Sequence, residues 1–232
     1  MSIDKDLVKL GDLSSANAKE RGSKICADVE ASALLEILWI RHLQKTSQTT
    51  FANCLLAGAE SGIREAVGCL VLGLSRPALN SLRMQIDLVM SWLYFKDHPV
   101  EWQMIQETGE NFKLKGEIFK YLRDWFPRFS DRWGVLVDIR TRTSPDPYRL
   151  LSAHMHGQNE PAIPIIIKPL DVIGTQKSQD EVIAIQGECS EFINDLFWAI
   201  LADSWRSVPR ELTDRLNARF KTDAQRATFF RH

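Results

Sequence analysis

The stretch SRPALNSLRMQIDLVMSWLYF, residues 75–95, decides the fold class. Its apolar side chains recur at spacings of three and four residues, at Leu79, Leu82, Ile86, Val89 and Leu93. This spacing is the period of an α-helix that packs one face against its neighbours. Ser75 is suited to cap the helix, and Pro77 lies in its first turn, where a missing N–H group does no harm. The stretch therefore predicts a long amphipathic helix that stops before Pro99.

Much of the remaining chain shows the same helical periodicity. Further helices are expected over residues 27–45, 50–73, about 100–122, 147–156 and about 180–205. Helices of this length joined by short connections pack as a bundle. The sequence therefore predicts an all-α fold, an up-down bundle of about five to six helices.

Residues 158–179 interrupt this pattern with three prolines and a run of isoleucines. Proline has no backbone N–H to donate, so within sheets it is confined to edges and bulges. We therefore expect an extended loop or an edge strand here, between the last two helices. The expected domain organisation is an N-terminal arm over residues 1–26, a helical domain over 27–205 and a basic C-terminal tail or helix over 206–232.

The composition of the 232-residue chain is that of an ordinary soluble globular protein, with 44% hydrophobic and 25% charged residues. A formal net charge of -1 argues against a globally basic nucleic-acid binder but leaves room for a local basic patch. No apolar run approaches the ~20 residues that cross a bilayer, and the amino terminus lacks the apolar core of a signal peptide. We expect a cytoplasmic protein with no membrane partner.

The four cysteines are scattered, with no CxxC pair, and are interpreted as small apolar fillers in a reducing compartment. A zinc site built from them would need distant segments to converge. No metal site and no cofactor are therefore expected.

A second stretch, PYRLLSAHMHG at residues 147–157, concentrates polar side chains that carry chemistry. Asp146 is suited to be the N-cap of a short helix, and Pro147 its first residue. Gly157 is suited to end it.

On such a helix Arg149, Ser152 and His156 fall within about 60° of one another, and Tyr148 flanks them. A neutral imidazole takes a proton from a ribose 2′-hydroxyl, and its protonated form supplies one to a leaving oxygen. A guanidinium binds a phosphate with two parallel hydrogen bonds. The four side chains therefore form a candidate catalytic set for metal-free cleavage of RNA, with Ser152 and Tyr148 as positioning groups.

His154 lies about 160° from His156 on this helix, so the His-x-His spacing does not form a metal pair. Residues 123–149 mix arginines with aromatic side chains, a combination that grips single-stranded RNA through phosphate contacts and base stacking. The expected RNA contacts are Arg140, Arg142, Arg83 and His154. For Arg83 an ion pair with Asp87 at i, i+4 is the alternative.

The tail over residues 206–232 has six arginines and one lysine against three acidic residues, a net charge of +4 before histidine. It is interpreted as an amphipathic helix that packs on a partner, an RNA-contacting arm or a solvated end.

Two segments resemble a known family. Residues 73–95 are similar to a G-x-x-x-x-A-x-x-x-L-R-x-x-[IL]-[DE] helix, with Gly73, Ala78, Leu82, Arg83, Ile86 and Asp87 in the matching positions. A later Tyr-x-x-Leu-Ser-x-x-x-His-Gly segment is matched by Tyr148, Leu151, Ser152, His156 and Gly157. Together with an arginine and a histidine that have four to six residues between them, these motifs resemble the HEPN superfamily of α-helical bundles.

The resemblance implies a bacterial, homodimeric, metal-independent endoribonuclease of a toxin–antitoxin or phage-defence system. It implies that the two motif helices meet across the dimer, that Arg149 stabilises the phosphate and that His156 is the acid or base. RNA and an antitoxin or partner effector are the implied partners. The alternative is a non-catalytic interaction or regulatory module, because Leu150 stands where catalytic relatives often have a polar residue.

Overall fold

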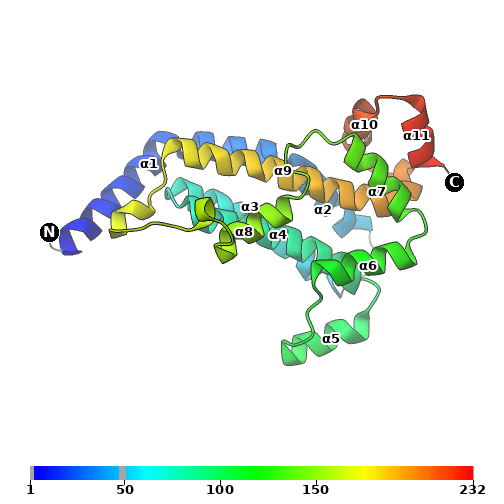
Figure 1. Ribbon diagram of the computed structural model, residues 1–232, viewed down its shortest axis with the longest axis horizontal. Coiled ribbons are helices and arrows are strands. Elements are labelled where there is room, and N and C mark those ends of the chain that lie inside the picture. The colour runs from blue at the N-terminus through cyan, green and yellow to red at the C-terminus, as the bar shows by residue number, and fades with distance from the viewer. Residues whose placement is uncertain (1–2, 47–50, 232) are drawn as a thin grey trace. The chain divides into compact units, whose positions relative to one another are not determined.

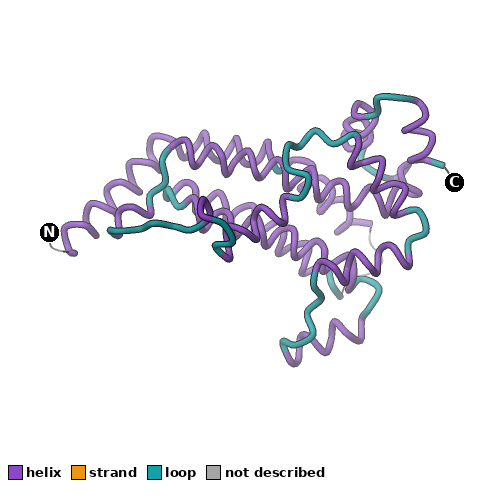
Figure 2. The backbone as a smooth tube through the Cα atoms, viewed as in Figure 1, coloured by secondary structure: helices purple, strands orange, loops and turns teal. Residues whose placement is uncertain are grey.

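The computed structural model describes residues 3–46 and 51–231 (Figure 1). These residues form eleven α-helices and three 3₁₀ helices, η1 to η3, and they contain no strand (Figure 2). The predicted all-α class is therefore confirmed for the described part of the chain. The first residue expected in the helix over 50–73, the first two of the arm and the last of the tail lie outside it.

The predicted count of five to six helices is wrong, because several helices are short. Where one helix was expected over 100–122, the chain forms α5 (Pro99–Thr108) and α6 (Lys115–Trp125). Gly109 ends α5 with a left-handed backbone, φ 71°, which glycine adopts without strain. Pro127 then separates α6 from α7 (Phe129–Asp138). The C-terminal segment adds α10 (Arg210–Arg219) and α11 (Asp223–Phe230).

The described residues divide into two compact units, each assembled from segments that are far apart in the sequence. The first unit takes its residues from the ranges up to 34, 61–85 and 146–190, and the second from 35–60, 86–145 and from 191 onward. The boundary expected at residue 26 falls inside α1 (Ile3–Ser32), so the expected arm is part of a long helix.

The first unit is built from α1, the end of α3 (Asn53–Val71), the first half of α4 (Ser75–Phe95), α8 (Pro147–His156), η1 (Glu160–Ala162), η2 (Pro169–Val172) and the start of α9 (Gln176–Leu201). Amide side chains tie these helices together. Asn17 on α1 donates to the backbone carbonyls of Leu70 and Val71 at 3.0 and 2.9 Å. Gln85 on α4 and Gln186 on α9 exchange two hydrogen bonds at 3.1 and 2.8 Å. Buried amides satisfied in this way specify which helix faces meet.

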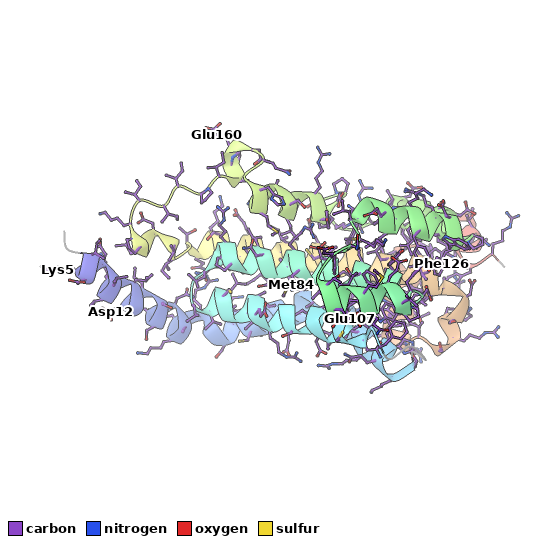
Figure 3. All side chains as sticks on the ribbon, turned by 90° about the horizontal axis from the view of Figure 1, so that it is seen from below. Lys5, Asp12, Met84, Glu107, Phe126 and Glu160 are labelled. Carbon is purple, nitrogen blue, oxygen red and sulfur yellow. The ribbon has the colours of Figure 1, made fainter. Side chains whose placement is uncertain are left out.

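The segment between α8 and α9 forms an irregular loop with two 3₁₀ turns rather than an edge strand. Glu160, which is exposed on η1, marks its beginning in Figure 3. The Asp171 carboxylate accepts from the backbone N–H groups of Ile167 and Lys168, so these groups bond within the loop instead of to a neighbouring strand.

The second unit is built from α2 (Leu34–Thr46), the start of α3, the second half of α4, α5, α6, α7, the end of α9, η3 (Ala202–Ser207), α10 and α11. Every residue of α9 from 191 to 200 is buried, as expected of a helix surrounded by others. The Trp39 indole N–H donates to Asn194 Oδ1 at 2.9 Å, and the Trp39 ring meets Trp198 edge-on at 5.1 Å. Aromatic side chains therefore form much of this core.

Gly73, which follows α3 in the first unit, is a position where an added side chain would be both strained and crowded. Its φ is 84°, and an added Cβ would lie 2.9 Å from Ile173 Cγ2. We expect Gly73→Ala to lower the free energy of unfolding by about 1–3 kcal/mol, since the left-handed backbone strains a side chain and Ile173 must move. Urea denaturation measures this loss.

Gly68→Ala is the matched control, because Gly68 lies within α3 and has open space where its Cβ would be. Alanine is the better helix former, so this variant is expected to gain up to about 1 kcal/mol. Equal effects of the two substitutions would contradict the assignment of Gly73 as a strained position.

Candidate functional site

The helix α8 has the bounds that the sequence predicts, because its end signals are local. The Asp146 carboxylate accepts from the backbone N–H of Arg149 at 3.3 Å, and Pro147 is the first helical residue. Gly157 ends the helix with φ 57°, and its N–H donates to the carbonyl of Ala153. The geometry expected for residues 147–156 as a helix therefore applies.

Arg83 of α4 joins the two sequence motifs within one chain. Its Nε donates to Ser152 Oγ at 3.1 Å, and its guanidinium carbon lies 3.3 Å from the centre of the Tyr148 ring. Tyr148 and Ser152 are four residues apart, so both lie on the face of α8 that meets Arg83. The resemblance places the two motif helices together across a dimer, whereas in this structure they meet in a single chain.

A second arginine of α4, Arg76, donates from Nη2 to the backbone carbonyl of His154 at 3.2 Å. Burial, reinforced by the positive charge of Arg76, lowers the pKa of the half-buried His154 imidazole. Sequence reasoning missed Arg76. The signal was its spacing of seven residues from Arg83, which puts both arginines on one face of α4.

Arg149 and His156 are exposed. They are seven positions apart, which is two helical turns less about 20°, so their Cα atoms lie about 10 Å apart along one face of α8. Within residues 3–46 and 51–231 neither side chain takes part in a hydrogen bond or an ion pair. The two groups with acid–base and phosphate-binding chemistry are therefore available to a ligand, whereas Tyr148 and Ser152 contact Arg83.

Two of the four expected RNA contacts are buried. Arg83 is 8% exposed and holds α8 to α4. Arg142 has a side chain that is 0% exposed and forms ion pairs with Glu191 and Asp195. Burial leaves Arg142 no surface with which to contact RNA, so the structure places it in the core of the second unit rather than at a binding site.

Arg219 completes this buried network, with its Nη1 2.6 Å from Asp195 Oδ1. Burial raises the pKa of Asp195, while Arg219 and Arg142 oppose the rise. Arg140 is half-buried and donates from Nη1 to the carbonyl of Val137 at 2.7 Å. Arg219, one of the cations of the C-terminal tail, is therefore a structural residue.

In the described ranges, no group of three or more His, Cys, Asp or Glu side chains is placed to hold a metal ion. The interpretation of the cysteines as apolar fillers fits Cys189, which is buried. It is wrong for Cys26 and Cys54, which are exposed. Among the residues described, no helix has both the length and the apolar character needed to cross a membrane.

No protein-family model, curated protein or solved structure matches this chain.

The Arg83–Ser152 hydrogen bond is the interaction of this site that a single substitution tests. We expect Ser152→Ala to lower the free energy of unfolding by about 1.5–3 kcal/mol, because it removes the acceptor of a buried charged donor. Thermal or urea unfolding, followed by circular dichroism, measures the change.

The control is Ser61→Ala, because Ser61 is exposed on α3 and alanine is a good helix former. Its unfolding free energy is expected to stay within about 0.5 kcal/mol of the wild type. An effect of Ser152→Ala as small as that of this control would show that the Arg83–Ser152 hydrogen bond does not stabilise the fold.

Proposed function

We propose that this chain is a metal-independent endoribonuclease of the HEPN class, acting in a bacterial toxin or phage-defence system. The observation that carries the proposal is the exposure of Arg149 and His156 on one face of α8, with no protein group bonded to either side chain in the described residues. An imidazole that transfers protons and a guanidinium that binds phosphate can together support RNA cleavage without a metal.

In the proposed reaction the 2′-oxygen of a ribose attacks the adjacent phosphorus, and the bond from phosphorus to the 5′-oxygen of the next nucleotide breaks. The 2′-hydroxyl loses its proton, and the departing 5′-oxygen gains one. The His156 imidazole serves one of these transfers, as base in its neutral form or as acid in its protonated form. The Arg149 guanidinium binds the phosphoryl oxygens, on which negative charge grows as the phosphorus becomes pentacoordinate.

Tyr148 and Ser152 support this reaction from inside the protein. Their contacts with Arg83, together with the Arg76 bond to the carbonyl of His154, hold α8 against α4 at three points. A helix fixed in this way keeps its exposed face in one orientation, which is what a catalytic pair requires. The homodimer and the antitoxin or effector implied by the resemblance remain part of the proposal.

The second candidate is a non-catalytic interaction module that works beside a partner effector. One observation favours it: Tyr148 and Ser152, two of the four motif side chains, are engaged by Arg83. In that case α8 is a supported surface for binding, and Arg149 and His156 contribute affinity without cleavage.

RNA cleavage in the presence of EDTA tests the proposal. Purified wild-type chain is expected to cleave RNA under these conditions, and Arg149→Ala and His156→Ala are each expected to slow cleavage by about 100-fold or more. A gel of total RNA, incubated with equal amounts of each variant, measures the rates.

Arg123→Ala is the matched control, because Arg123 is also an exposed arginine, on α6, and makes no ion pair among the described residues. Its activity is expected to equal that of the wild type. Cleavage that survives both α8 substitutions would refute the proposed site, and RNA binding without cleavage by the wild type would favour the interaction module.

A further inference from the structure

The basic C-terminal segment uses several of its arginines in ion pairs. Arg219 is joined to buried Asp195, and Arg210 and Arg215 pair along α10 with Asp214 and Glu211. Arg206 and Arg226 are among the cations of this segment that have no carboxylate partner within the described residues. Part of the segment's positive charge is therefore not neutralised by a carboxylate of the described residues.

These two arginines line the same cavity of about 400 Å³ in the second unit. Trp205 and Arg206 come from η3, and Asn217 comes from α10. The remaining lining residues are Asp223, Arg226, Ala227 and Phe230, which recur at spacings of three and one on a single face of α11. The volume lies within the range of about 300–1,000 Å³ that small-molecule sites occupy.

The cavity combines aromatic surface with cationic groups. The Trp205 and Phe230 rings lie 5.8 Å apart at 59°, and the Arg206 guanidinium lies 5.7 Å from the Trp205 ring. Arg226 donates from Nε to Asn217 Oδ1 at 3.2 Å, which holds its guanidinium at the cavity. Rings of this kind bind a flat ring by stacking, and arginines bind a phosphate.

Asp223 adds an acceptor to this wall of the cavity. A carboxylate would repel a ligand that carried only negative charge, but it accepts hydrogen bonds from hydroxyl or amine groups. A ligand that matches the whole lining has a flat ring, one anionic group and hydroxyl donors between them. Ribose supplies such hydroxyls, and a nucleobase supplies the ring.

We propose that this cavity binds a nucleoside 5′-monophosphate, with the base against Trp205 and Phe230 and the phosphate between Arg206 and Arg226. Asp223 accepts from the ribose hydroxyls. The site belongs to the second unit and uses no residue of α8, so the proposal stands independently of RNA cleavage. It gives the basic tail a role beyond the partner helix, RNA arm or solvated end expected from sequence.

Isothermal titration with adenosine 5′-monophosphate and uridine 5′-monophosphate tests the site. At least one of the two is expected to bind with one equivalent per chain, and adenosine or uridine without phosphate is expected to bind at least about tenfold more weakly. Arg206→Ala and Arg226→Ala are each expected to weaken binding of the monophosphate by about tenfold or more.

A second variant blocks the cavity without removing a contact. Ala227 is exposed and lines the cavity, so Ala227→Glu is expected to abolish binding by filling space and repelling phosphate. Arg210→Ala, which removes an equal charge outside the cavity, is the matched control and is expected to bind like the wild type.

Three results would overturn the proposal. They are no binding of either monophosphate, equal binding by wild type and the two arginine variants, or binding of RNA oligonucleotides alone. Since the readout is heat of binding, failure of RNA cleavage leaves this test unaffected.

Discussion

The rest of the first unit's candidate site depends on the burial of one positive charge, the guanidinium of Arg83. A buried cation is costly unless its donors are bonded and its faces are covered. Ser152 supplies a hydrogen-bond acceptor and Tyr148 a ring face, and both come from α8. The contacts of Arg83 with Ser152 and Tyr148 therefore fix the position of α8 on α4. With α8 held in this position, Arg149 and His156 are exposed.

The parts of this arrangement that the sequence predicts are those set by nearby residues. The bounds of α8 depend on Asp146, Pro147 and Gly157, which lie within twelve consecutive positions, and their chemistry is that of any helix end. The relative directions of His154 and His156 follow from helical geometry alone. The contact of Arg83 with Ser152 joins positions 69 residues apart, so no local pattern contains it.

The incorrect predictions also concern contacts between residues that are far apart in the sequence. Arg142 was expected at a surface because arginines and aromatic residues surround it in sequence, but its partner Asp195 lies 53 residues further along the chain. The C-terminal tail is a second example. Its net charge can be counted from the composition. Only the structure shows that Arg219 pairs with Asp195 and that Arg206 and Arg226 line a cavity formed with α11. The sequence therefore predicts the amount of charge, but it does not predict which charged side chains pair with a distant partner.

The central claim is that His156 and Arg149 cleave RNA by attack of the ribose 2′-hydroxyl, and the chemistry of the RNA ends tests it most directly. Mass spectrometry of RNA incubated with the wild type in EDTA is predicted to show 2′,3′-cyclic phosphate and 5′-hydroxyl ends, which His156→Ala is predicted to produce at least about 100-fold more slowly. Ends that carry a 5′-phosphate, or RNA left intact by the wild type, would contradict the claim.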